Sequence, residues 1–214
     1  MKKFFTVIVA TAALTFGFNT GATAQVEQGN MIVDLYYGFP NFGKTLWKVL
    51  EDDTSNANTK ATGIGPLGGR FEYMIADNLG FGVDINYLSN GFEYDYTSSV
   101  YDTTTSTFVN KTYHVAYTKQ KLRIMARLNY HFVQTDVVDA YVGFGAGYKH
   151  KINKFTSTNP DDTESDLETG LNLVPVSIRI CLGTRFFFTE NIGINMELGA
   201  GGGPLLSGGL SLKF

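Results

Sequence analysis

The chain has 214 residues, enough for one domain of ordinary size, and a formal net charge of −3. This mild acidity argues against a nucleic-acid partner, because surfaces that bind nucleic acids are basic. Glycine (24), phenylalanine (17) and tyrosine (12) are abundant and proline (5) is scarce, which favours a β-rich chain over a soluble helical enzyme. The single cysteine, Cys181, excludes an intramolecular disulfide.

The first 24 residues have the pattern of a cleaved secretory signal. Lys2 and Lys3 precede an apolar run over residues 4–16, and Ala22-Thr23-Ala24 is a small-x-small cleavage site before Gln25. A membrane anchor is the alternative, but the run is too short to span ~30 Å of hydrocarbon. We expect residues 25–214 to form one domain, whose formal charge is −5 because the signal removes two lysines and no acid. No stretch of 18 uncharged apolar residues follows, so no transmembrane helix is expected.

After the signal, apolar residues alternate with polar or small ones, the pattern of strands with one apolar face. It is clearest over residues 79–87, where Asp84 and glycines separate large apolar side chains. In a soluble sandwich the apolar face would pack against another sheet, whereas in a membrane barrel it faces lipid. The pattern occurs eight times, over residues 31–37, 67–75, 79–87, 122–132, 140–148, 176–188, 192–200 and 206–214.

The even strand count and the sorting of short and long connections are typical of outer-membrane barrels, which place short turns at one end and long loops outside the cell. A soluble sandwich has no reason to sort its loops in this way. The sequence therefore predicts an all-β fold, an eight-stranded antiparallel up-and-down transmembrane barrel, with strands near the ~9–11 residues that cross a bilayer. Tight joins are predicted at 76–78, 133–139 and 189–191. The other joins are mostly long and polar, at 38–63, 89–115 and 151–173, and the last of them, around 202–204, is short.

Charged residues on the second face of the strands would point into this barrel. An eight-stranded barrel is only wide enough for side chains to fill, and buried charge is costly unless it is paired. We therefore expect an ion-pair network and a plugged lumen; the alternative is the solvated face of a soluble sheet. Lys149 has the same inward phase. The predicted network consists of Arg70, Glu72, Asp84, Arg123, Arg127, Arg179, Arg185 and Glu197.

Three segments resemble the small outer-membrane β-barrel family, whose familiar members are the OmpX-type and OmpA-type transmembrane domains. They are the signal end Ala22-Thr23-Ala24, the hairpin Arg70-Phe71-Glu72-Tyr73 to Asn78-Leu79-Gly80, and the C-terminal Gly209-Leu210-Ser211-Leu212-Lys213-Phe214. In that family the terminal segment is read by the barrel-assembly machinery. The resemblance implies this role for Leu210, Leu212 and Phe214.

The resemblance also implies an outer-membrane location and contact with outer-membrane lipid and lipopolysaccharide. It says little about activity, because fold does not determine function. We expect a monomer with no cofactor, no bound metal and no domain after the barrel.

An enzymatic alternative rests on a second resemblance. Some eight-stranded outer-membrane barrels are lipid A deacylases with a His-x-Ser-Asn signature, and Ser89-Asn90 is similar to its second half. Tyr87 stands where that signature has histidine, so Ser89 lacks an evident base unless His114 approaches from the next strand. His114, His131 and His150 have no metal-ligand spacing, and we expect structural roles and no catalytic residue.

Two of the long loops carry their own signals. Phe42, Leu46 and Leu50 would align on one face of a short amphipathic helix beside Trp47, which we expect to pack on the barrel rim; the membrane surface or a partner are alternatives. Residues 89–115 are rich in threonine and tyrosine, which predicts that two strands continue above the membrane as a hairpin. An exposed edge there suits recognition by strand addition.

The predicted function is therefore a non-enzymatic outer-membrane protein with a structural or surface-interaction role. A small-solute pore is the first alternative and requires that the inward charges leave a water column. A lipid A-modifying enzyme is the second and requires a base beside Ser89.

Overall fold

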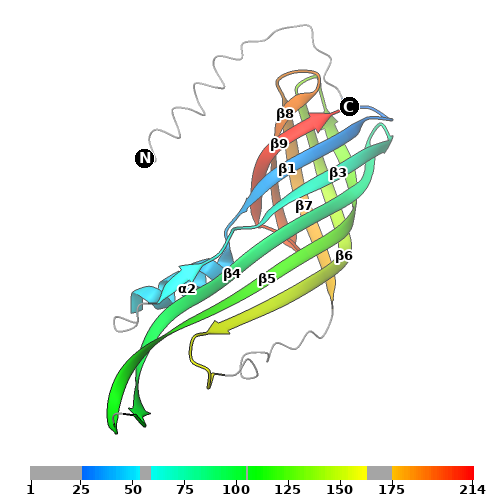
Figure 1. Cartoon of the computed structure of the whole chain (residues 1–214). Helices are drawn as coiled ribbons and strands as arrows, with labels where there is room; N and C mark the ends of the chain where they lie inside the picture. Colours follow the sequence, from blue (N-terminus) through cyan, green and yellow to red (C-terminus); the bar gives the residue numbers. More distant parts are fainter. Residues whose placement is uncertain (1–25, 54–58, 105, 163–174) are drawn as a thin grey trace, which may run out of the picture.

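The computed structural model describes residues 26–53, 59–104, 106–162 and 175–214, and shows one closed antiparallel barrel (Figure 1). The expected signal segment and its cleavage residues Ala22, Ala24 and Gln25 lie outside the described residues. Eight strands close the barrel, while a short strand, β2 (Lys60–Thr62), and a helix, α2 (Phe42–Asp53), lie beside it. The barrel strands are β1 (Met31–Phe39), β3 (Leu67–Ala76), β4 (Leu79–Asp102), β5 (Thr107–Gln134), β6 (Val138–Ser157), β7 (Val176–Phe187), β8 (Ile192–Gly201) and β9 (Leu206–Lys213).

Each barrel strand pairs with its neighbour in the chain, and β1 closes the circle by pairing with β9. The closing register runs from Ile32 opposite Lys213 to Phe39 opposite Leu206. The prediction of an eight-stranded up-and-down barrel is confirmed. Closure gives every strand two partners within the membrane, where water cannot satisfy backbone groups.

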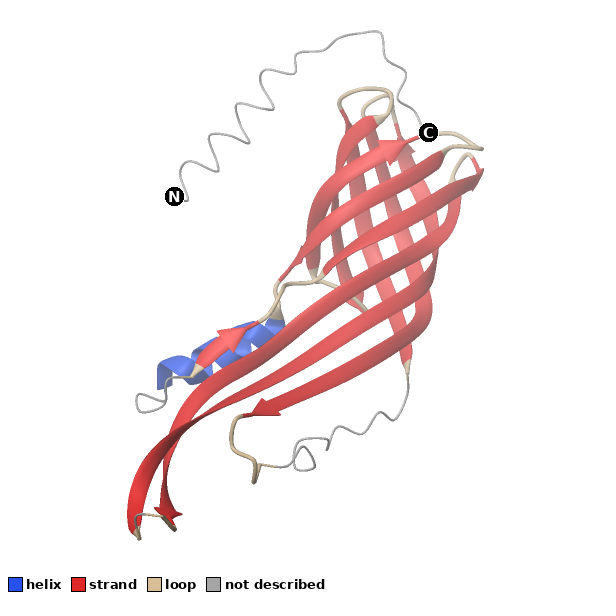
Figure 2. Ribbon diagram, viewed as in Figure 1, coloured by secondary structure: helices blue, strands red, loops and turns tan. Residues whose placement is uncertain are grey.

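Three strands are longer than the ~9–11 residues that a bilayer crossing needs. β4, β5 and β6 have 24, 28 and 20 residues, about two to three times that length. β4 and β5 stay paired as far as Asp102 opposite Thr107, so the predicted hairpin is confirmed. β6 also remains in strand through Ser157, where a loop from residue 151 was expected. Threonine and tyrosine favour strand conformation, which lets these strands continue beyond the rest of the barrel (Figure 2).

The outer face of the barrel is apolar and exposed. Ile85 and Ile124 lie side by side in the β4–β5 register and are 47% exposed each, and Leu182 opposite Leu198 is similar. Such a continuous exposed apolar surface is expected where lipid replaces water. The residues that the alternation placed on the outside are therefore outside, and their polar neighbours point inward.

Helix α2 lies against β2 and β4, but two residues of its predicted apolar face are not packed on the rim. Its start is fixed because the Asn41 side chain donates to the carbonyls of Ile64 and Ser89, but Phe42 and Leu46 are 65% and 61% exposed. The side chains of Trp47 and Leu50 lie outside the described residues. Among helices in the described ranges, none is both long and apolar enough to cross a bilayer.

Candidate functional site: the charged interior and the raised sheet

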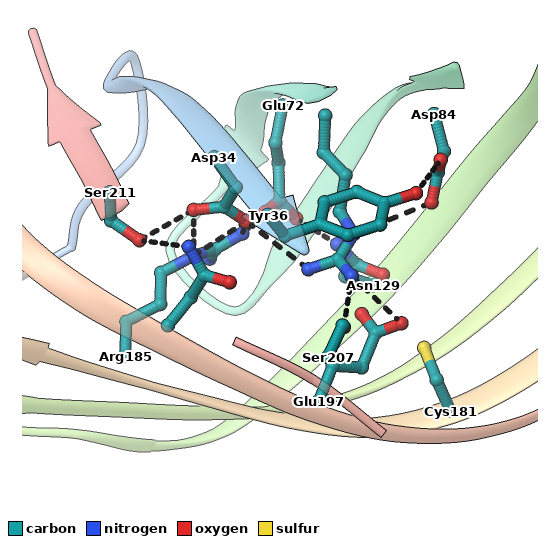
Figure 3. A network of polar contacts seen from close by, with 12 residues as sticks. Asp34, Tyr36, Glu72, Asp84, Asn129, Cys181, Arg185, Glu197, Ser207 and Ser211 are labelled. Carbon is teal, nitrogen blue, oxygen red and sulfur yellow. Dashed lines mark hydrogen bonds and ion pairs between the residues drawn. The ribbon is translucent and has the colours of Figure 1, made fainter. Parts of the chain in front are cut away.

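The barrel interior is filled by a network of charged and polar side chains to which all eight strands contribute. Figure 3 shows a part of this network. Its charged members are at most 3% exposed, so each must be paired to be tolerated there. Four arginines and five carboxylates take part, together with one histidine. They are Asp34, Arg70, Glu72, Asp84, Arg127, His131, Asp139, Arg179, Arg185 and Glu197.

Glu197 on β8 is the centre of one half of the network. Its carboxylate accepts two hydrogen bonds from Arg179, at 2.8 and 3.0 Å, and one of 2.8 Å from Arg127. Arg70 lies 3.3 Å away and also reaches Asp84, which accepts from Arg127 and from the Tyr36 hydroxyl. Charge-assisted bonds from several strands therefore converge on two carboxylates.

Arg185 on β7 is the centre of the other half. Its guanidinium reaches Asp34 (2.9 Å), Glu72 (2.6 Å) and Asp139 (2.9 Å), which come from β1, β3 and β6. The two ring nitrogens of His131 lie 2.6 Å from Asp139 and 3.0 Å from Glu72. Both nitrogens can donate only in the imidazolium form. With His131 charged, the network holds five positive and five negative groups.

Glycines on the inner face make room for these large side chains. A Cβ at Gly80 would lie 2.0 Å from the Glu72 carboxylate, and one at Gly183 would lie 2.2 Å from the Tyr141 ring. Tyr141 in turn packs under the Arg185 guanidinium, 4.6 Å from it, and donates to Glu197. The alternation of small and large inner residues is how a narrow barrel fits its contents.

The structure brings together seven of the eight residues that the sequence singled out for the lumen. The prediction was wrong for Arg123, which lies at the mouth of the barrel. It donates to Asn86 Oδ1 at 3.1 Å and has no carboxylate partner among the described residues. Sequence reasoning missed Asp34, Asp139 and His131. Each has the inward phase of its strand, so phase was the signal that could have found them.

The geometry around Ser89 lacks the arrangement that the enzymatic alternative needs. Ser89 lies opposite Gln120, whereas His114 lies opposite Asp95, six residues further along the ladder or roughly 20 Å away. His114 Nδ1 is instead 2.7 Å from Asp95 Oδ1. The Ser89 carbonyl serves as an acceptor for Asn41, which is a structural role.

Beyond the rim, residues 88–102, 107–121 and 149–157 of β4, β5 and β6 form what we term the raised sheet. The opposite wall ends earlier, since β7 starts at Val176, opposite Tyr148. β2 pairs with β4 over Gly91–Glu93 only. From Tyr94 outward β4 pairs with β5 alone in the described part of the chain, and Figure 1 shows this ribbon extending far from the barrel.

A comparison with protein-family models assigns this barrel to a family. Residues 10–201 match the model of the outer membrane protein beta-barrel domain. The chain belongs to this family. Membership implies a location in the bacterial outer membrane, as expected from the apolar outer face. A search of curated proteins finds no match to this chain.

Several solved barrels are similar to this member of the outer membrane protein beta-barrel domain family. A de novo designed transmembrane β-barrel has 13% identity and a TM-score of 0.41, covering 89% of this chain and 99% of its own. The N-terminal barrel domain of Pseudomonas aeruginosa OprF has 10% identity and a TM-score of 0.33, covering 88% and 99%. Ail, the attachment invasion locus protein of Yersinia pestis, has 12% identity and a TM-score of 0.37, covering 87% and 99%.

Within the described residues, no three His, Cys, Asp or Glu side chains are grouped to hold an ion. Cys181 is buried beside Arg127, whose Nη2 lies 2.9 Å from its sulfur, so it packs as a small inner residue.

Proposed function

We propose that this protein is a non-enzymatic outer-membrane barrel that contacts a partner outside the cell through its raised sheet. The barrel interior serves stability: its charges hold the strands together and leave it plugged. The raised sheet serves recognition, because it carries the part of the chain that stands clear of the membrane.

The observation that carries the proposal is the unprotected edge of β4. Proteins commonly blunt exposed strand edges with lysine or proline to avoid unwanted pairing. Residues 94–101 read Tyr-Asp-Tyr-Thr-Ser-Ser-Val-Tyr, contain neither, and pair with β5 alone among the described residues. An extended segment of a partner can add to such an edge through backbone hydrogen bonds, with the tyrosines giving side-chain contact.

A shortened hairpin tests this role. Replacing residues 97–112 by Asn-Gly leaves Tyr96 opposite Tyr113 as the last pair and supplies a two-residue turn that matches strand twist. The contacts of Tyr96 with Asn159 and Asp162 remain. Beads carrying the wild-type or shortened protein in nanodiscs are then compared on an array of extracellular proteins and glycans.

We expect the shortened protein to fold, as judged by heat-modifiable gel migration, and to lose binding that the wild type shows. Equal binding by both proteins, or no binding by either, contradicts the proposal.

The plugged interior is tested by single-channel conductance of the folded protein in a planar bilayer. The ten paired charges of the lumen predict silence, because side chains fill a barrel of this size. A steady, reproducible conductance would contradict the plugged interior and would favour the small-solute pore as the function. The binding experiment with the shortened hairpin does not depend on whether the barrel conducts.

A further inference from the structure

Five basic side chains gather where the barrel interior opens into the raised sheet. Lys119, Lys121 and Arg123 come from β5, and Lys149 and Lys151 from β6. Arg123 lies opposite Lys149 and Lys121 lies opposite Lys151, so these four share one face. That face continues the inner face of the barrel, because Arg123 is two residues from the buried Met125 and four from the buried Arg127. We call these five residues the basic rim cluster.

The cluster lacks the counter-charges that every lumen arginine has. In the described ranges the side-chain ammonium groups of its four lysines have no hydrogen bond or ion pair, and Arg123 bonds to the neutral Asn86 while its buried Nε has no acceptor. The β4 residues opposite Arg123, Lys121 and Lys119 are Asn86, Leu88 and Asn90, none of them acidic. Asp84, one step deeper on this face, is already bonded to Arg70 and Arg127.

The five cations act on one another. Burial and then the charges of Arg123, Lys119, Lys151 and Lys149 lower the pKa of Lys121, which lies just outside the lipid-facing segment that begins at Leu122, from 10.5 to about 8. A fold keeps such repulsion only if something else offsets it. Lysines on the β6 edge can be explained as protection against strand addition, but Lys119 and Lys121 lie on β5, between two partners.

We propose that the basic rim cluster binds a soluble oligoanion that carries several phosphate or sulfate groups. Opposed residues on neighbouring strands are ~5 Å apart and alternate residues along a strand ~6.6 Å apart, so the cations form a grid that several anionic groups can contact at once. Lysine binds phosphate as a point charge and needs no fixed geometry.

The side chains of the basic rim cluster point toward the barrel mouth, which favours a soluble anion over a lipid phosphate as the ligand. Its side chains share the inner face, whereas the neighbours Leu122, His150 and Ile152 point to the outer face of the sheet. A soluble ligand entering the mouth therefore reaches the cations, and a lipid phosphate in the surrounding leaflet does not. On the same face, the rings of Phe92 and Tyr117, 5.7 Å apart, continue the surface outward. This inference does not depend on the strand-addition role proposed above.

Isothermal titration of inorganic tripolyphosphate into the full-length protein in phosphatidylcholine nanodiscs tests the proposal at low salt. The test variant is Lys121→Gln with Lys151→Gln. The control is Lys111→Gln with Lys154→Gln, which removes the same charge from the hairpin and from the outward face of β6. We expect wild type and control to bind alike, the test variant to bind about tenfold or more weakly, and all affinity to fall with added salt.

A second readout separates binding from a structural role. Because the unligated cations repel one another, the Lys121→Gln, Lys151→Gln variant should melt no lower than the wild type without ligand. Tripolyphosphate should raise the melting temperature of the wild type and of the control, but not that of this variant. Three results overturn the proposal: no binding by the wild type, equal loss in test and control variants, or binding only to nanodiscs that contain lipopolysaccharide.

Discussion

At the scale of single residues, the interior charges are the feature on which stability depends. Glu197 is 1% exposed and accepts from Arg127 and Arg179 while lying 3.3 Å from Arg70. Each of these arginines would be costly to bury alone, so the carboxylate is shared among three strands. Arg70 Nη1 and Arg127 Nε have no hydrogen-bond acceptor, so the described part of the network does not satisfy every donor of its arginines.

Glu197→Gln should therefore be strongly destabilising. The amide keeps the shape but removes the charge, and breaking a buried ion pair costs about 3–5 kcal/mol. Urea unfolding of the protein in lipid vesicles, followed by gel migration, measures the change. Glu190→Gln, in the exposed turn before β8, is the control and should be neutral. Equal midpoints for both variants would contradict a stabilising network.

The second residue-scale prediction concerns pH and Lys121. Because its pKa is lowered from 10.5 to about 8, the unfolded chain holds this proton more tightly than the folded protein does. The charge thus destabilises the fold below pH 8, and that cost is relieved as pH rises from 8 to 10.5. Lys121→Gln should raise the melting temperature at neutral pH, and the gain should vanish above pH 10.5. Lys111→Gln is the control, and a pH-independent gain would contradict the prediction.

At the scale of elements, the last strand closes the barrel through its backbone and presents its apolar side chains outward. Phe214 exchanges backbone hydrogen bonds of 2.8 and 2.9 Å with Met31, yet its ring is 65% exposed. Leu210 is likewise 56% exposed. The ring at position 214 therefore contributes little to packing within the barrel, which leaves it available for recognition during assembly.

Phe214→Ala should separate assembly from stability. If the terminal segment is an assembly signal, the variant should insert poorly into the outer membrane of living cells, while the purified protein refolded in detergent should melt within a few degrees of the wild type. Insertion is measured by heat-modifiable migration in membrane fractions. Normal insertion would remove the signal role, and a large loss of stability in detergent would make the residue structural.

At the scale of the whole molecule, the barrel divides into a lipid-facing zone and a zone that rises above it. Ile180 on β7 lies within the apolar outer band and is 59% exposed. Ile152 on β6 is 40% exposed but belongs to the raised sheet, beyond the last residue that pairs with β7. The same side chain thus meets lipid at one position and water or headgroups at the other.

Ile180→Arg should destabilise the protein in lipid by about 2–4 kcal/mol, whereas Ile152→Arg should cost about 0–1 kcal/mol, because the penalty for arginine falls toward the interface. Unfolding in phosphatidylcholine vesicles gives both values. Similar penalties at the two positions would mean that the membrane boundary has been placed at the wrong height on β6.

Local sequence determined the strands and their faces. The period-two pattern over residues 79–87 is enough to orient each side chain, because successive residues on a strand must point to opposite sides. The same reasoning predicts eight barrel strands and the turn at Asp77-Asn78, and both are present in the structure. It also predicts that Arg127 and Glu197 point inward, and both side chains are buried.

The tertiary structure alone decided which inward residues meet. Asp34 and Arg185 are 151 positions apart in the chain, and their contact at 2.9 Å exists because β1 closes on β9 and faces β7 across a narrow lumen. Likewise Arg123 and Arg127 have the same phase, yet only Arg127 has an ion pair, because the residue opposite Arg123 is the neutral Asn86 and Asp84 is already bonded to Arg70 and Arg127. Alternation is a property of one strand, whereas the height and pairing of a charge depend on where all eight strands start and stop.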